Sequence, residues 1–300
     1  MQSTSDNPQT TTRRDIHQQV TDTIIRQLEA GTIPWHRPWK GADHRLPPLP
    51  LNYSTNKKYR GVNILLLWCT SIEKNFSSPE WASFKQWQQQ KELIRKGEKG
   101  SLIVYYDTIE REVDGEIKKI PFLKSSIVFN RCQLQSYQEP VEPVETHEPL
   151  LALKIAPIDE FVENTKAHIA HIGSSACYVP KDDIIYMPDM EKFITTETCT
   201  ATEGYYSTLL HELAHWTGAE KRLNRTKGKK FGDENYAVEE LTAELTAAFL
   251  CAEFDITTLD KGDHAAYIAH WLKVLKDNKQ FVITAASDAS KAADYLYGLQ

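Results

Sequence analysis

The chain has 300 residues, 41% of them hydrophobic, which is enough for two ordinary domains with separate cores. No apolar run approaches the ~18 residues of a membrane span, and the polar N-terminus does not have the pattern of a secretory signal. Five scattered cysteines without C-x-x-C spacing argue against a disulfide framework or a cysteine zinc site and favour a reducing cytoplasm.

Charge divides the chain into two unlike halves. Residues 1–138 hold 20 Lys and Arg against 14 Asp and Glu, whereas residues 139–300 hold 15 against 27. The net charge of −6 therefore conceals a basic front half. Such a basic half is compatible with a nucleic-acid partner.

The front half is predicted to be α+β. An amphipathic helix is expected over Asp15–Ala30, because apolar residues recur there every four positions before Gly31. An aromatic and proline-rich loop follows at 34–40. Further helices are predicted over 59–69 and 81–95. Strands are predicted over 101–112, 116–123 and 126–135.

Cations and aromatic residues are interleaved along this half, as in proteins that hold single-stranded nucleic acid by phosphate contacts and base stacking. The candidate DNA-binding residues are Trp35, Arg37, Trp39, Lys40, Lys57, Tyr59, Arg60, Lys85, Lys96 and Lys99. Most individual aromatics in such a set are expected to be core residues, so the argument rests on the group as a whole. Trp81, Phe84 and Trp87 can line the inner face of their helix.

A stretch rich in Pro and Glu separates the halves and has the composition of an extended linker. We therefore predict a domain at 1–138, a linker at 139–150 and a second domain at 151–300. In the second domain we expect a helix over 158–171, strands at 176–178 and 183–187, and a largely helical end over 264–299. The strand at 183–187 is either a sheet edge that receives a peptide or a plain core strand.

The most informative motif is His211-Glu-Leu-Ala-His215, within an apolar helical run that stops at Gly218. Two histidines four residues apart share a helix face and can bind one ion, while Glu212 can serve as general base toward a water. Two surface histidines on a core helix are the alternative. We favour a catalytic zinc site, although such a site also accepts other divalent ions.

The third ligand is expected from the predicted helix over 236–251. Glu240 and Glu244 share a face, so we assign Glu240 as ligand and Glu244 as the residue that orients a histidine, or as the alternative ligand. Glu239 projects ~100° away and is interpreted as a solvated charge. An oxyanion donor could come from Tyr178, Tyr236, His264 or Tyr267, and the sequence does not select among them.

From about residue 15 to 298 the chain resembles the ArdC-type antirestriction proteins of conjugative plasmids. The motifs that carry the resemblance in the front half are Leu28–Trp35 with Pro38-Trp39, Tyr59–Asn63, Trp81 with Phe84–Gln86, Arg95–Gly100 and Val128–Asn130. Those in the rear half are Asp183–Pro188, His211–His215 with Thr217-Gly218, Tyr236–Glu244 and His264–Ala269. The resemblance implies an N-terminal single-stranded DNA-binding domain and a C-terminal zincin-like metallopeptidase domain of the polyvalent-protein type. The chain is also similar to Spartan-like proteases, which join DNA binding to a zinc peptidase.

We therefore expect a bacterial, cytoplasmic protein that protects incoming DNA from host restriction during conjugation, acting in the recipient cell. Its expected partners are single-stranded DNA, bound without strong sequence preference, and a protein or peptide substrate such as a DNA-associated protein or a restriction enzyme. The alternative is a non-enzymatic DNA shield with a structural or vestigial zinc site. Recognition of a specific duplex fits poorly, because no helix-turn-helix or zinc-finger spacing occurs.

Overall fold

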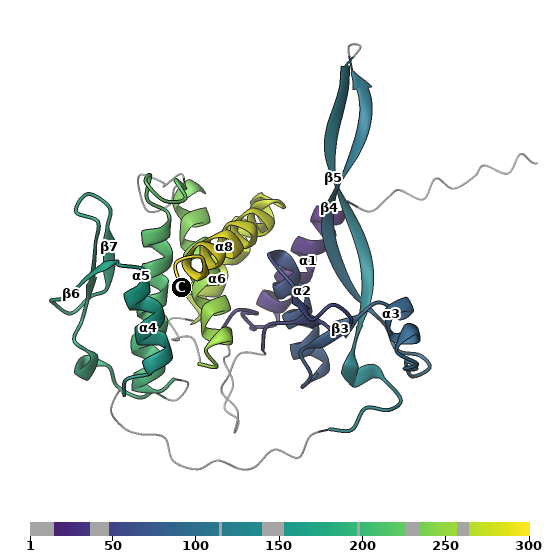
Figure 1. Cartoon of the computed structure of the whole chain (residues 1–300), viewed down its shortest axis with the longest axis horizontal. Coiled ribbons are helices and arrows are strands. Elements are labelled where there is room, and N and C mark those ends of the chain that lie inside the picture. Colours follow the sequence, from purple (N-terminus) through teal and green to yellow (C-terminus); the bar gives the residue numbers. More distant parts are fainter. Residues whose placement is uncertain are drawn as a thin grey trace, which may run out of the picture.

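The computed structural model describes residues 15–36, 48–113, 116–139, 153–196, 199–225, 234–256 and 264–300, and within them the side chains of 106–121, 234–235 and 264–265 are not described. The fold is mixed α+β, as predicted. A helix-rich rear half lies beside a front half from which a long β-hairpin projects (Figure 1).

The first helix, α1 (Ile16–Glu29), forms where the apolar spacing predicted it. Asp15 caps its N-terminus by accepting a hydrogen bond from the His17 N–H. Its buried face carries Val20, Ile24 and Leu28. Helix α2 (Val62–Lys74) begins three residues later than predicted, and apart from Asn63 its residues from Val62 to Cys69 are apolar and buried.

The prediction of one helix over 81–95 is wrong. Residues Glu80–Ala82 form strand β3, and only Phe84–Gln89 form helix α3. The break comes at Ser83, whose side chain accepts from the Gln86 N–H while the Gln86 side chain accepts from the Ser83 N–H. This capping box starts a new helix and leaves Trp81 in the sheet.

The front sheet has the strand order β2-β1-β3-β5-β4. Strands β1 (Leu51–Asn52) and β2 (Lys57–Lys58) are short, whereas β4 (Ser101–Val113) and β5 (Glu116–Asn130) form the projecting hairpin of Figure 1. The two strands predicted over 116–135 are one continuous strand, β5, followed by a 3-10 turn at Arg131–Gln133.

In the rear half, the helix predicted over 158–171 ends early. Helix α4 (Ala156–Asn164) gives way at Lys166, whose φ is +57°, and His168–His171 then form strand β6. Strands β7 (Cys177–Val179) and β8 (Ile184–Met187) complete a sheet of order β6-β8-β7, and a 3-10 turn follows at Met190–Lys192. Strand β8 is therefore central, and the antiparallel edge is β7.

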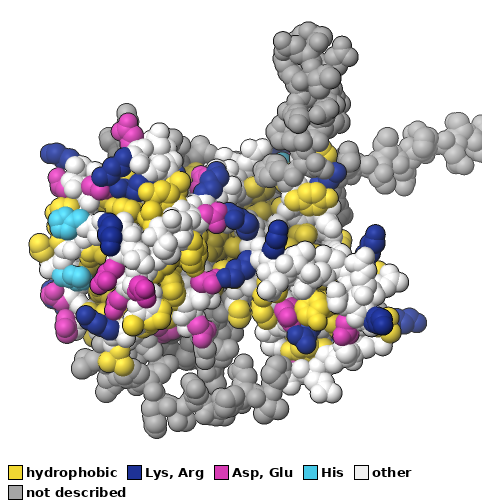
Figure 2. Space-filling view, in the orientation of Figure 1, with side chains coloured by type: hydrophobic (Ala, Val, Ile, Leu, Met, Phe, Trp, Pro, Cys, Tyr) yellow, Lys and Arg dark blue, Asp and Glu magenta, His cyan; other side chains and the backbone are white. Residues whose placement is uncertain are grey.

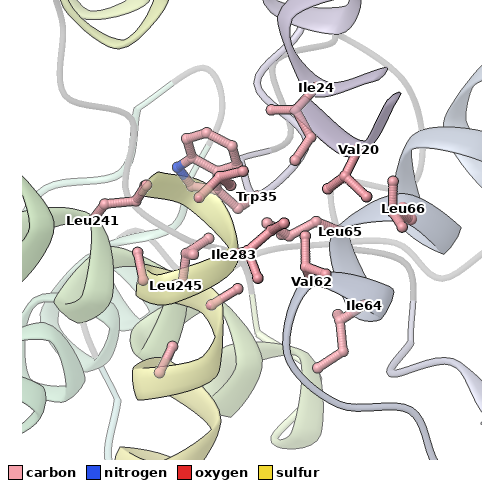
Figure 3. Close-up of a cluster of buried hydrophobic side chains, with 14 of the residues drawn as sticks. Val20, Ile24, Trp35, Val62, Ile64, Leu65, Leu66, Leu241, Leu245 and Ile283 are labelled. Carbon is pink, nitrogen blue, oxygen red and sulfur yellow. The ribbon is translucent and has the colours of Figure 1, made fainter. Parts of the chain in front are cut away.

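Four long helices complete the chain: α5 (Ala201–Thr217), α6 (Glu234–Glu253), α7 (His264–Asp277) and α8 (Phe281–Tyr297). Helix α6 is central, because it packs with α5 and α8 and its residues belong to both large hydrophobic clusters, with Phe249 meeting Trp68 of α2. Figure 3 shows Trp35, Val62 and Ile24 of the front half meeting Leu241, Leu245 and Ile283 of the rear half. The two halves thus share one hydrophobic cluster, while residues 140–150 of the predicted linker lie outside the described residues.

Charged side chains also join the halves. Lys58 pairs with Glu253, and Arg60 pairs with Asp294. Basic side chains gather along this junction beside acidic ones (Figure 2). Within the described ranges, no helix combines the length and the apolar character needed to cross a bilayer.

Candidate metal centre

Helix α5 places the two histidines of the motif side by side. Its N-terminus is fixed by a capping box between Thr200 and Glu203, and its apolar residues are buried against the rear sheet and α6. His211 and His215, one helical turn apart, present their rings edge to face with centroids 4.8 Å apart. Glu212 lines the same pocket as the two histidines, with 8% of its surface exposed.

Helix α6 brings Glu240 to these rings. Its carboxylate oxygens lie 3.9 Å from His211 Nε2 and 3.6 Å from His215 Nε2. Tetrahedral zinc ligands at their usual bond lengths stand about 3.4 Å apart, so a small contraction would enclose an ion. Among the described residues, these three form the one group of His, Cys, Asp or Glu side chains with that spacing. The structure therefore assembles the metal-binding His-His-Glu site that the sequence predicted.

Glu239 is not a solvated charge, which corrects the prediction for this residue. Only 5% of it is exposed, and its Oε1 lies 3.1 Å from His215 Nδ1. This contact orients the ring so that Nε2 faces Glu240. Burial by itself raises the pKa of the Glu239 carboxyl, but hydrogen bonds from Arg225 and His215 outweigh it and lower that pKa to about 2.

Arg225 holds this carboxylate in place from the loop after α5. Its guanidinium donates twice to Glu239, each time at 2.9 Å, and also to Thr217 Oγ1 and the Ala214 carbonyl at 2.7 Å. Gly218 provides the space, because a Cβ there would come within 2.8 Å of Arg225 Nη2. Neither of these roles was predicted from the sequence. The sequence did contain a signal. Carboxylates in an apolar helix need a positive partner, and a basic loop comes just before this helix in the chain.

Glu244 has a different place from the one predicted. Its carboxylate accepts hydrogen bonds from the Trp35 indole and the Tyr267 hydroxyl, and it is not a member of the His-His-Glu group. The orienting role toward a histidine belongs to Glu239 instead. Because α6 is buried on several sides, the buried carboxylates of Glu239 and Glu244 each need a partner. Arg225 donates to Glu239, whereas Trp35 and Tyr267 donate to Glu244.

The edge strand β7 holds the proposed base. The Tyr178 N–H donates to Glu212 Oε2 at 2.8 Å, so this strand fixes the carboxylate beside the metal ligands. The Tyr178 hydroxyl points elsewhere: it donates to Asp183 and accepts from Arg222, which also stacks on Trp216. Residues of β7, α5 and α6 line a pocket of about 400 Å³ in front of the site. A peptide-receiving edge at 183–187 is excluded, since β8 is paired on both sides.

The predicted DNA-binding residues do not share one environment. Trp35 is fully buried, so its ring has no surface for a base, and Tyr59 packs against the buried cluster of Leu67, Trp81 and Val128. Arg60 is ion-paired with Asp294. Arg60 is nevertheless exposed, as are Lys57, Lys85, Lys96 and Lys99. Arg37, Trp39 and Lys40 lie outside the described residues.

Each half of the chain matches a known protein family. The family described as the N-terminal domain of anti-restriction factor ArdC matches residues 14–129, and the family described as zincin-like metallopeptidase matches residues 156–288. The crystal structure of the antirestriction ArdC protein from plasmid R388 is similar in its metal-free form, with 38% identity, a TM-score of 0.78, and coverage of 95% of this chain and 97% of that chain. Its Mn(II)-bound form gives 38% identity, a TM-score of 0.76, and coverage of 95% and 98%.

Two curated relatives extend the comparison. The uncharacterized protein y4eC of Sinorhizobium fredii is 35% identical, over 98% of this chain and 94% of its own length. A DNA primase TraC of Escherichia coli is 32% identical over 96% of this chain. The match spans only 27% of that primase.

Proposed function

This chain belongs to the family of ArdC antirestriction proteins, with a zincin-like metallopeptidase domain, and from this premise we propose a zinc-dependent peptidase joined to a single-stranded DNA-binding half. In a bacterium it would protect DNA that enters by conjugation from restriction. The observation that carries the enzymatic part is the buried Glu212 between the edge strand β7 and the His-His-Glu group.

His211, His215 and Glu240 would hold the ion, and their nitrogen and oxygen donors suit zinc. Such an ion, when bound, acidifies a water molecule and polarises a peptide carbonyl. Glu212 would take the proton of the attacking water and pass it to the leaving amine. The Tyr178 N–H keeps the Glu212 carboxylate in place for both transfers, and Glu239 keeps the His215 ring from turning. A protein segment would lie extended along β7.

The support for DNA binding is a group of exposed rings and cations around α3. Phe84 is 60% exposed and Tyr53 is 37% exposed. The Tyr53 ring packs against Trp87 of α3 at an interplanar angle of 33°, with centroids 4.8 Å apart, and Phe84 begins the same helix. Exposed Lys85 and Lys57 lie on α3 and on the strand next to Asn52. Rings of this kind stack bases without sequence preference while cations contact phosphates.

Shielding without cleavage is the alternative function. The rings around α3 belong to elements other than the β7, α5 and α6 residues that line the metal pocket, so DNA could be covered without peptide hydrolysis. This alternative keeps the ion as a structural component.

Glu212→Gln separates the two functions in a conjugation assay with a restriction-proficient recipient. Protection that falls to the level without the protein supports the peptidase, and full protection supports the shield. Glu220→Gln is the matched control, because Glu220 is exposed just beyond α5. Cleavage of labelled casein, measured with and without an oligo-dT strand, reports the activity directly.

A further inference from the structure

The pocket contains one tyrosine whose hydroxyl faces the metal centre. Tyr236 lines the pocket together with His211, Glu212, His215 and Glu240. It lies four residues before Glu240 on α6, and therefore on the same helix face. Its hydroxyl donates a hydrogen bond to the Glu240 carboxylate and also lies within the electrostatic field of Glu212. The hydroxyl of Tyr236 therefore lies in the pocket beside one metal ligand and the proposed base.

The other tyrosines that could serve as donors are committed elsewhere. The Tyr178 hydroxyl donates to Asp183 at 2.8 Å and accepts from Arg222 at 2.9 Å. The Tyr267 hydroxyl donates to Glu244 and accepts from Trp35, and Tyr267 is not among the residues that line the pocket. The side chain of His264 lies outside the described residues. Among the described residues, the geometry therefore favours Tyr236.

We propose that Tyr236 is a catalytic residue that donates a hydrogen bond to the oxygen of the scissile carbonyl as negative charge develops there. The proposal rests on the peptidase function proposed above. Water adds to the carbonyl carbon, its proton goes to Glu212, and the carbonyl electron pair moves onto the oxygen that Tyr236 contacts. The C–N bond then breaks, the proton passes from Glu212 to the amine, and a carboxylic acid and an amine leave. Tyr236 keeps its proton throughout.

The hydroxyl of Tyr236 lies beside both Glu240 and Glu212 on the wall of the pocket. A cation held by Glu240 would weaken this carboxylate as an acceptor. The hydroxyl would then turn from Glu240 and donate to the carbonyl oxygen of the substrate, which is bonded to the attacked carbon.

The test compares full-length wild type, Tyr236→Phe and Tyr205→Phe. Tyr205 is the matched control, because its hydroxyl contacts His171 Nε2 at 2.9 Å and it is not among the residues that line the pocket. Three quantities are measured: turnover of labelled casein at saturating zinc, zinc affinity by calorimetry, and affinity for N-phosphoryl-leucyl-tryptophan, whose tetrahedral phosphoryl oxygens resemble the oxyanion.

For Tyr236→Phe we expect a fall in turnover of about 10²- to 10³-fold, the usual effect of removing one oxyanion donor, and weaker binding of the phosphoryl peptide. Zinc affinity should stay within a factor of about three, which is no more than one hydrogen bond usually contributes. Tyr205→Phe should keep wild-type turnover.

Unchanged turnover and phosphoryl-peptide affinity in Tyr236→Phe would overturn the proposal. A loss of zinc affinity, with turnover restored by excess zinc, would also overturn it and make Tyr236 a residue that only positions Glu240. Failure of the proposed function looks different. In that case wild type and Glu212→Gln are equally inactive on casein, and the catalytic role falls with it.

Discussion

The indole Nε1 of Trp35 donates a hydrogen bond to Glu244 Oε2 at 3.4 Å, across a separation of 209 residues. The same nitrogen lies 3.2 Å from the Tyr267 hydroxyl, which also binds Glu244. One turn before Glu244, the same helix carries Glu240 toward the histidines. The loop after α1 is therefore fastened to the helix that completes the metal site.

Trp35→Phe should destabilise the protein without weakening DNA binding. The substitution keeps a ring but removes a donor from a buried carboxylate, at a cost of about 1–3 kcal/mol in the free energy of unfolding. Urea denaturation measures this loss, and titration with labelled oligo-dT measures the affinity. Normal stability together with a loss of DNA affinity would mean that Trp35 stacks on bases after all.

Phe84→Ala and Tyr53→Ala should each weaken oligo-dT binding. A stacked base contributes about 1–3 kcal/mol, so the dissociation constant should rise about 5- to 150-fold for each ring that stacks. Leu93→Ala is the control, because Leu93 is 61% exposed but not aromatic. Equal affinities for wild type and the three variants would show that DNA binds at a surface other than α3.

Glu239→Gln should lower zinc affinity while Glu240 remains in place. The amide cannot match the carboxylate as an acceptor from His215 and Arg225, and loss of such an outer contact usually costs about 10- to 100-fold in metal affinity. Calorimetric zinc titration tests this, with Glu220→Gln as the exposed control. An affinity equal to wild type would leave Glu239 with a role in folding alone.

Asp183→Asn should reduce stability at neutral pH but not in acid. The hydrogen bond from Arg222 is the largest cause that lowers the pKa of Asp183; burial opposes it, and hydrogen bonds from Lys221 and Tyr178 add to it. A carboxyl with a depressed folded-state pKa stabilises the fold above its unfolded pKa of about 3.9, and this stabilisation is lost as pH falls through the folded value.

Urea midpoints of wild type and Asp183→Asn should therefore differ at pH 7 and converge as the pH falls below about 4. Asp182→Asn, at the exposed neighbouring position, is the control. A constant difference at every pH would show that the charge of Asp183 does not contribute.

The metal ligands could be predicted because helix geometry alone relates them. His211 and His215 repeat at four residues, and a carboxylate such as Glu240 in a buried helix requires a positive partner. Glu239 and Glu244 could not be told apart in this way, because α6 is buried on several sides and their partners come from distant segments. Arg225 reaches Glu239 from the preceding loop, and Trp35 reaches Glu244 from the other half of the chain.

Local signals and long-range packing also account for the differences in the front half. The Ser83–Gln86 capping box is visible in the sequence and could have placed the start of α3 correctly. The burial of Trp35 could not have been foreseen, since an aromatic ring beside cations has the same pattern on a DNA-binding surface as at the edge of a core.

Metal content per chain tests the central claim most directly, by elemental mass spectrometry of zinc-loaded wild type, His215→Ala, Glu240→Ala and Glu244→Ala. The geometry predicts about one zinc in wild type and in Glu244→Ala, and loss of that zinc from His215→Ala and Glu240→Ala. Zinc retained by Glu240→Ala, or absent from wild type, would contradict the site described here.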